Sequence, residues 1–165
     1  LAKETNEIMP KEMQEKIESI WYDIEEFTGT KFNHDFWKVC KARRSTYLAC
    51  KAVTCAKEQD MENEMIDAIQ KAYYLEAKNP SDEDTLINLA KNLNLDIEKF
   101  ESELRSEKIE LLFQEDLSKR RKLNVYSFPT LLLQYKKEIY PIKIEYNNPK
   151  KILEQIIDLS TNRYF

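Results

Sequence analysis

The sequence lacks a Cys-x-x-Cys pair and contains only three cysteines, Cys40, Cys50 and Cys55. They are too few, and odd in number, for the disulfide framework of a small secreted protein. In a shared helix Cys50 and Cys55 would lie about 140° apart around the axis, which excludes a local redox pair. A bridge between Cys40 and Cys50 stays open, but buried or half-buried thiols are the simpler interpretation. His34 and the cysteines fit no zinc spacing, so no metal site is predicted.

Positive charge is outweighed by negative charge. The chain has 26 lysine and arginine residues against 30 acidic residues, which gives a net charge of −4. Without a basic field the protein cannot gather phosphates, so no nucleic-acid partner is expected. No apolar run approaches the roughly twenty residues that span a bilayer, and residues 1–5 lack the apolar core of a signal peptide. The sequence therefore predicts a globular protein of the cytoplasm with no membrane partner.

The most informative segment is Ser127-Phe128-Pro129-Thr130, which runs directly into Leu131-Leu132-Leu133. A proline at the start of an apolar run marks the first residue of a strand and a candidate cis peptide bond. Residues 136–138 predict a turn, and the alternation over residues 139–146 predicts a second strand. Pro141 would place this second strand at a sheet edge. The residues expected to face the core are Tyr140, Ile142, Ile144 and Tyr146.

A helix is expected after this hairpin, because Asn147-Asn148-Pro149 supplies an N-cap followed by proline at the first helical position. Its apolar stripe comprises Ile152, Leu153, Ile156 and Ile157.

We call residues 127–130 the proline loop. Upstream of it, apolar side chains recur at three- and four-residue steps and predict helices almost throughout. The first helix follows Pro10 and ends at Gly29, the only glycine. Its apolar face comprises Met13, Ile17, Ile20, Trp21, Ile24 and Phe27. Residues 32–37 form a dense aromatic patch. Further helices are expected to begin at Ser45 or Thr46, near Met61, after Ser81, at Asp96 and at Ser106.

Five segments occur in an order that carries a resemblance. They are Arg43-Arg44-Ser45-Thr46-Tyr47-Leu48-Ala49-Cys50-Lys51-Ala52, Ala72-Tyr73-Tyr74-Leu75-Glu76, Asn79-Pro80-Ser81-Asp82, the stretch from Leu89-Ala90 to Leu95-Asp96, and Ser127-Phe128-Pro129-Thr130. In this order the chain resembles DsbA-family thioredoxin-fold proteins, in particular predicted protein disulfide isomerases related to FrnE and to 2-hydroxychromene-2-carboxylate isomerases. Such proteins commonly have glycine where this chain has Asn94, Asn124 and Ser127. Asparagine tolerates a positive φ, so we expect the first two turns to be kept.

The resemblance implies an α+β fold, thioredoxin-like and mostly helical. Residues 1–122 would form a mainly helical insertion domain with a connecting helix, and residues 123–165 the C-terminal half of a thioredoxin-like domain. The activity implied is that of a bacterial-type thiol-disulfide oxidoreductase or protein disulfide isomerase. The family's catalytic Cys-x-x-Cys would precede Leu1, and the chain does not begin with methionine. We therefore expect a piece of a longer protein, without catalytic residues of its own and inactive alone.

The resemblance also implies where a substrate would bind. The candidate substrate-binding residues are Ser127, Phe128, Pro129, Trp37, Arg43 and Arg44. The proline loop would hold a substrate backbone by strand-like pairing, unless it is only a tight loop that enters a strand. The tryptophan would line a substrate groove, although aromatic residues at this spacing more often belong to a core. The two arginines would hold an anion such as a glutathione carboxylate, although a solvated surface pair is the favoured interpretation.

The expected partners are protein or small-molecule thiols and disulfides. No resident cofactor is expected, and glutathione would act as a co-substrate. Without the family's first strands, the Leu131-Leu132-Leu133 strand would leave a sheet edge exposed, through which a homodimer could form. Two other functions stay open: a glutathione-dependent isomerase or transferase of the same fold, and a helical interaction module without enzymatic activity.

Overall fold

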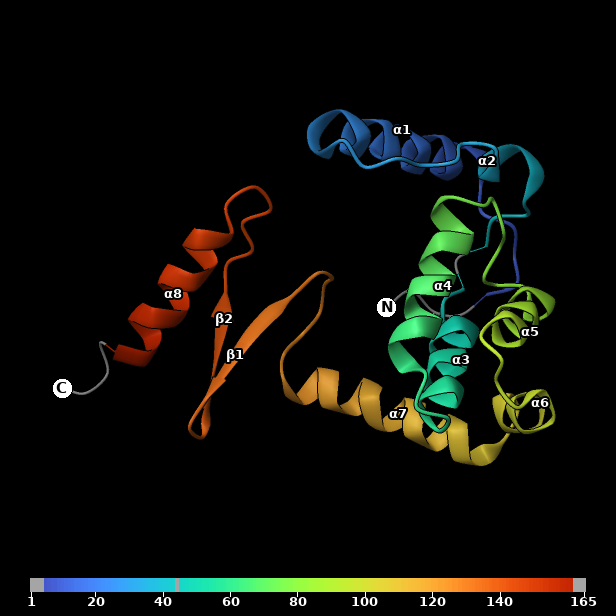
Figure 1. Ribbon diagram of the computed structural model, residues 1–165. Coiled ribbons are helices and arrows are strands. Elements are labelled where there is room, and N and C mark those ends of the chain that lie inside the picture. The colour runs from blue at the N-terminus through green and yellow to red at the C-terminus, as the bar shows by residue number, and fades with distance from the viewer. Residues whose placement is uncertain (1–4, 44, 162–165) are drawn as a thin grey trace. The chain divides into compact units, whose positions relative to one another are not determined.

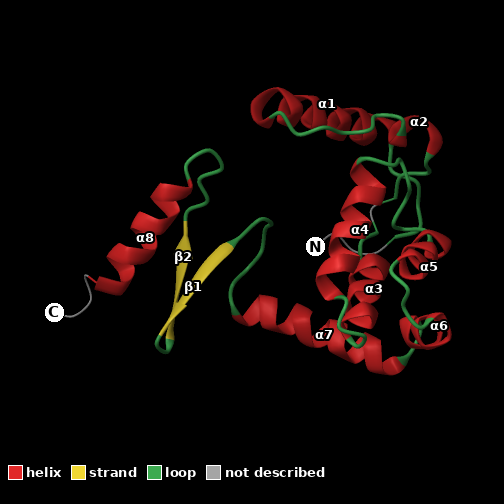
Figure 2. Ribbon diagram, in the orientation of Figure 1, coloured by secondary structure: helices red, strands yellow, loops and turns green. Residues whose placement is uncertain are grey.

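A computed structural model describes residues 5–43 and 45–161 of the chain (Figure 1). The chain divides between residues 115 and 116 into two compact units. We call the described residues up to 115 the helical unit and those from 116 onward the sheet unit. Figure 2 shows helices in the helical unit and both strands of the described chain in the sheet unit. This arrangement confirms the predicted class, a mostly helical α+β fold.

The helical unit contains α1 (Lys11–Thr28), α2 (Phe36–Val39), α3 (Tyr47–Lys57), α4 (Glu62–Tyr74), α5 (Glu83–Asn92), α6 (Ile97–Leu104) and the first part of α7 (Glu107–Lys122). The sheet unit contains the end of α7, β1 (Leu131–Tyr135), β2 (Glu138–Ile142) and α8 (Pro149–Thr161). The predicted domain boundary, between residues 122 and 123, falls at the end of α7.

The main core of the helical unit lies between α3, α4, α5, α6 and the start of α7. Each helix presents an apolar stripe to the others, as the three- and four-residue spacing predicts. The largest side chains that are fully buried in this core are Phe100, Met65, Leu86, Ile109 and Cys55. Burial of such side chains stabilises the folded state by roughly 1.5–3 kcal/mol each.

A second, aromatic core lies around Trp21 of α1, which is only 4% exposed. The Trp21 ring stacks on Phe32 with centroids 5.0 Å apart and meets the Tyr73 ring edge-on at 5.5 Å. The backbone N–H of Asn33 donates to the carbonyl of Tyr74 at 2.7 Å, which ties the segment after α1 to the end of α4. The aromatic patch predicted at residues 32–37 therefore packs α1 and α2 against α4.

Helix ends follow local sequence signals in most places. Gly29 ends α1 with φ of 74°, and Asn94 has φ of 57° after α5, as expected for residues that tolerate the left-handed conformation. Asp96 caps α6, because its side chain accepts a hydrogen bond from the Lys99 N–H at 3.0 Å. Thr46 occupies the N-cap position of α3, as predicted. Its side chain forms no capping hydrogen bond, however, so the expected capping interaction is wrong.

The apolar face of α1 is divided. Trp21 is buried, whereas Ile20, Ile24 and Phe27 are 44%, 37% and 66% exposed. The sequence pattern predicts the apolar face of this helix but does not say which of its side chains are buried. The elements that pack against a helix decide which part of its apolar face is buried, and these elements lie elsewhere in the sequence.

The two strands of the sheet unit form an antiparallel hairpin in which Leu133 faces Tyr140 and Leu131 faces Ile142. Lys136 has φ of 57° in the tight turn. β2 ends at Ile142, and Tyr146 is 71% exposed, so the expected strand to Tyr146 is wrong. The reason lies in α8: the Gln155 side chain accepts from the Lys143 N–H at 2.9 Å and donates to the Lys143 carbonyl at 3.0 Å.

α8 begins at Pro149, as predicted. None of the described residues of this helix is fully buried. Leu153 and Ile157 are 58% and 56% exposed, whereas Ile152 and Ile156 are half-buried. The predicted stripe is therefore only partly covered in the sheet unit.

Candidate functional site

The proline loop leaves α7 and enters β1. After α7 the backbone turns at Asn124, whose φ is 55°, and Val125 is buried. The Arg120 side chain donates to the Val125 carbonyl at 2.8 Å, which fixes the start of the loop. The next residue, Tyr126, is 70% exposed. The loop therefore departs from an anchored point and then runs along the surface of the sheet unit.

Residues 127–130 are held by one internal hydrogen bond. The Thr130 hydroxyl donates to the Ser127 carbonyl at 2.6 Å, and the Phe128–Pro129 peptide bond is cis. Phe128 is 61% exposed. The loop thus presents an aromatic ring and backbone groups to solvent directly before β1. Thr130 is a functional candidate that the sequence analysis did not select. Its position directly after Pro129 could have indicated it.

A hollow of about 510 Å³ lies beside the loop within the sheet unit. It is lined by Lys122, Leu123, Asn124, Thr130, Leu132, Ile139 and Pro141. Apart from Leu123, its apolar side chains come from one face of the hairpin, on which Leu132 faces Pro141 across the strands. A substrate that lies along the loop would have this face and the Lys122 ammonium group within reach.

Trp37 lies in the helical unit, among the aromatic rings around Trp21. The Trp21 and Trp37 ring centroids are 4.9 Å apart, and Phe36 is 1% exposed beside them. The Trp37 indole nitrogen is itself buried. This placement favours a packing role, and the predicted role of Trp37 in a substrate groove stays a prediction.

Arg43 is paired rather than solvated. Its guanidinium donates to the Asp82 carboxylate, and its side chain is only 17% exposed. The favoured interpretation of a solvated arginine pair is therefore wrong for Arg43, because a residue 39 positions away in the sequence supplies its partner. Its capacity to hold a glutathione carboxylate stays a prediction. Arg44 lies outside the described residues.

The cysteines lie in different surroundings. The Cys40 thiol donates to the Ala77 carbonyl at 3.0 Å, so no bridge joins it to Cys50, which is exposed on α3. Burial, with the Asp82 carboxylate nearby, raises the pKa of Cys40. Cys55 is fully buried in the main core, and burial raises its pKa to about 12, with Glu103 adding to the shift. Neither Cys40 nor Cys55 is activated as a thiolate nucleophile.

His34 lies between two carboxylates and not among the cysteines. Its Nδ1 is 3.4 Å from Glu18 Oε1, and its Nε2 is 3.3 Å from Glu25 Oε2. Its ring stacks on Tyr22 with centroids 3.9 Å apart. Within the part of the chain that the structure describes, no group of three or more His, Cys, Asp or Glu side chains could hold a metal ion.

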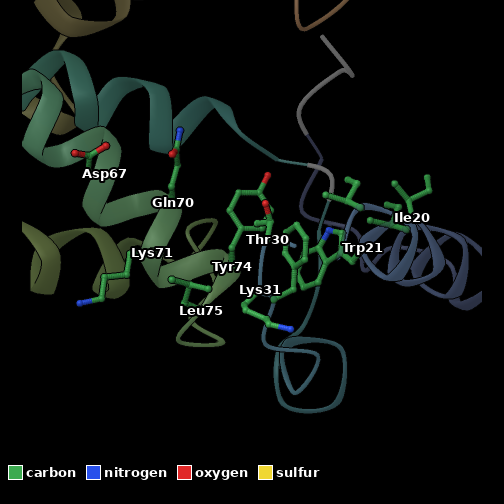
Figure 3. Close-up of a pocket in the computed structure, with 12 residues that line it drawn as sticks. Ile20, Trp21, Thr30, Lys31, Asp67, Gln70, Lys71, Tyr74 and Leu75 are labelled. Atoms are coloured by element: carbon green, nitrogen blue, oxygen red, sulfur yellow. The ribbon is translucent and has the colours of Figure 1, made fainter. Parts of the chain in front are cut away.

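A larger hollow, of about 610 Å³, lies in the helical unit between α1, the segment after it and α4 (Figure 3). It is lined by Ile17, Ile20, Trp21, Ile24, Thr30, Lys31, Phe32, Asp67, Gln70, Lys71, Tyr74 and Leu75. In Figure 3 the Trp21 and Tyr74 rings lie close together, and their centroids are 5.6 Å apart. The sequence analysis placed the isoleucines on the apolar face of the first helix and gave no signal for this hollow.

No helix in the described ranges is long and apolar enough to cross a membrane. A helical unit, a proline loop, an antiparallel hairpin and a C-terminal helix, in this order, define a DsbA-like protein of the thioredoxin fold. A family model described as thioredoxin matches residues 5–155, and the chain belongs to that family. No curated protein matches the sequence.

Solved structures share this fold. A predicted protein disulfide isomerase from Nitrosomonas europaea has a TM-score of 0.80 at 20% identity, over 98% of this chain and 79% of that one. The cytosolic disulfide reductase DsbM from Pseudomonas aeruginosa has a TM-score of 0.73 at 19% identity, over 93% and 80% of the two chains. DsbM with GSH has a TM-score of 0.71 at 18% identity, over 94% and 80%. At these identities the likeness establishes the fold.

Proposed function

We propose that this chain belongs to a thiol-disulfide oxidoreductase and that residues 127–130 hold the backbone of its thiol or disulfide substrate. The observation that carries the proposal is the exposed loop before β1, closed by the bond between Thr130 and Ser127 and displaying Phe128. An extended segment can pair with backbone groups at a strand entry, while the aromatic ring packs on its side chains. The family match over residues 5–155 supports this role.

The substrate that we propose is glutathione or a protein disulfide. One related structure, the disulfide reductase DsbM, contains GSH, and that enzyme is described as cytosolic. Lys122 borders the hollow beside the loop and would attract a glutathione carboxylate. We propose the cytosol as the location of this chain as well, and a homodimer through the edge of its two-stranded sheet stays a prediction.

We expect the 165-residue chain to show no thiol-exchange turnover by itself. The attacking species is a thiolate, a second thiol must resolve the mixed disulfide, and the sequence has no Cys-x-x-Cys. Because burial raises the pKa of both Cys40 and Cys55, neither thiol is poised to attack. The measurement is insulin reduction by dithiothreitol, compared with a variant in which all three cysteines are replaced by alanine. A rate above that of the cysteine-free variant would contradict the expectation.

Removal of the Phe128 ring should weaken binding of oxidised glutathione without loss of stability. The ring is 61% exposed, so Phe128→Ala removes contacts with a ligand rather than with the core. We expect affinity to fall about three- to tenfold, since a partly buried aromatic contact contributes about 1 kcal/mol. Isothermal titration calorimetry measures the affinity, and thermal unfolding measures the stability.

The matched control is Tyr146→Ala, because Tyr146 is 71% exposed and lies beyond β2. It should leave the affinity for oxidised glutathione unchanged. Equal losses in both variants would argue against the loop as the binding site. A loss confined to Phe128→Ala, together with binding of S-alkylated glutathione as tight as that of the disulfide, would favour the glutathione-dependent isomerase or transferase. If neither form of glutathione binds, the remaining candidate function is a helical interaction module without enzymatic activity.

A further inference from the structure

The charge of the chain is divided unevenly between its two units. The described part of the helical unit, residues 5–43 and 45–115, has 14 lysine and arginine residues against 24 acidic residues. The sheet unit, described over residues 116–161, has nine against five. The proline loop therefore belongs to a basic unit of an acidic chain. Because the Debye length is about 8 Å at physiological ionic strength, a substrate on the loop senses the nearby charges more strongly than the net charge of the chain.

The end of α7 places positive charge directly before the proline loop (Figure 1). We call its last four residues the α7 basic cluster: Lys119, Arg120, Arg121 and Lys122. Arg120 is tied to the start of the loop, since its carbonyl accepts from the Val125 N–H at 3.0 Å and its guanidinium donates to the Val125 carbonyl at 2.8 Å. Lys122 lines the same hollow as Thr130 of the loop. The cluster therefore borders the proposed substrate site.

The α7 basic cluster has no carboxylate partner among the residues that the structure describes. Most cations of the helical unit do have one. The first two members of the cluster follow an acidic residue by four positions, whereas Arg121 and Lys122 follow an uncharged residue at that spacing. A helix C-terminus attracts cations by itself, but the dipole neutralises only part of a charge of four. The exposed Arg121 and Lys122 are thus available to an acidic ligand.

The hollow beside the loop sets a second requirement. Among the described residues that line it, Lys122 is the only charged one, and Leu132, Ile139 and Pro141 supply apolar surface from the hairpin. A ligand that matches both features has an apolar group for the hollow and carboxylates for the cluster. An extended polypeptide provides both, because its side chains follow one another every 3.3 Å or so and alternate in direction.

We propose that the α7 basic cluster makes the proline loop selective for acidic polypeptides, in which carboxylate side chains flank the cysteine of the disulfide. This inference rests on the proposed function and adds a class of substrate to it. The carboxylates of the substrate lie along Arg121 and Lys122, and an apolar side chain enters the hollow. Oxidised glutathione offers the same carboxylate chemistry at Lys122, but Arg121 lies outside the lining of the hollow and distinguishes the two ligands.

The test uses the full chain and three labelled peptides in fluorescence anisotropy. Each peptide has a central S-methylcysteine between apolar residues, and its flanking positions carry glutamate, glutamine or lysine. We expect saturable binding of the glutamate peptide, about fivefold weaker binding of the glutamine peptide, and still weaker binding of the lysine peptide. A rise in salt should reduce the affinity for the glutamate peptide to that for the glutamine peptide, because exposed ion pairs are screened.

Arg121→Gln should weaken binding of the glutamate peptide about threefold and leave the affinity for oxidised glutathione unchanged. Arg121→Gln/Lys122→Gln should weaken the peptide about fivefold, to the affinity of the glutamine peptide. Both side chains are exposed, so thermal unfolding should hardly change. The matched control is Lys150→Gln/Lys151→Gln on α8, which removes the same charge from exposed positions of the same unit and should leave the peptide affinity unchanged.

Equal affinity for the glutamate and glutamine peptides, with both weakened by Phe128→Ala, would overturn the selectivity and leave the proposed function standing. Binding of the glutamate peptide that Phe128→Ala does not weaken would place the peptide away from the loop and overturn both. Equal losses in Arg121→Gln/Lys122→Gln and in the control would assign the effect to the net charge of the unit. Tighter binding of a single-stranded oligonucleotide than of the glutamate peptide would make the cluster a nucleic-acid site. Each of these last two results overturns the selectivity.

Two further results would assign the cluster to the protein itself. A dimer in sedimentation equilibrium that Arg121→Gln/Lys122→Gln dissociates would make the acidic helical unit of a second copy the partner. Loss of glutamate-peptide binding when these 165 residues are part of a longer polypeptide would show that another segment of the same protein covers the cluster. Either result would overturn the proposal.

Discussion

Replacement of Phe100 by alanine should lower the free energy of unfolding by about 3–5 kcal/mol. The Phe100 side chain is 0% exposed and belongs to the main core of the helical unit. Its removal loses the transfer free energy of the ring and leaves a cavity that the neighbouring helices can fill only in part. Since domains of this size are stable by about 5–15 kcal/mol, such a loss is a large part of the total. The measurement is urea unfolding followed by circular dichroism.

Phe27→Ala is the matched control for Phe100→Ala, because it deletes the same ring from a position that is 66% exposed. We expect a change of less than about 0.5 kcal/mol in the free energy of unfolding, as for most surface substitutions. If the two variants lost similar stability, the Phe27 ring would be covered in the folded protein rather than exposed on α1.

Cys55 should react with a thiol reagent about a thousandfold more slowly in the folded protein than in urea at the same pH. Burial raises its pKa from 9.0 to about 12, and each unit reduces the thiolate fraction tenfold at pH 8. The exposed Cys50 serves as an internal comparison in the same sample. Mass spectrometry of tryptic fragments after timed alkylation separates the two residues, because trypsin cleaves at Lys51 between them. Rapid modification of Cys55 would mean that the main core opens frequently.

The same shift makes stability depend on alkaline pH. The folded state keeps the Cys55 proton up to about pH 12, whereas the unfolded chain loses it near the ordinary thiol pKa of 9.0. Between these values the unfolded state binds fewer protons, so stability falls as pH rises from about 9. Burial also raises the pKa of Tyr73, which acts in the same direction. Cys55→Ala should flatten the fall, and Cys55→Ala/Tyr73→Phe should flatten it further, in thermal unfolding between pH 8 and 11.

Local signals in the sequence were enough to predict where most helices end. The φ of Gly29, the φ of Asn94 and the cap at Asp96 each depend on the chemistry of a single residue and its nearest neighbours. β2 was predicted four residues too long because the groups that end it come from Gln155, twelve residues after Lys143. No alternation of side chains along the strand itself records such a partner.

In the candidate site, too, features that depend on local sequence were predictable, whereas features that depend on distant elements were not. The proline loop was visible in the sequence, because proline before an apolar run constrains the backbone locally. The ion pair of Arg43 with Asp82 and the exposure of Ile20 and Ile24 were not, since each depends on which distant elements meet. The periodicity of α1 correctly located an apolar face but could not divide it between the buried Trp21 and the exposed side chains.

Gln155 acts on Lys143 as a neighbouring strand would. Its side-chain amide offers one acceptor and one donor, the same pair that a peptide group presents across a ladder, and Lys143 uses both. The helix therefore supplies an imitation of one residue of a third strand. An incoming strand that paired alongside Lys143 would first have to displace this amide, so the hairpin is protected at that residue against uncontrolled extension of its sheet. A further strand could therefore pair with the hairpin only at residues of β1 and β2 whose backbone groups no helix side chain occupies.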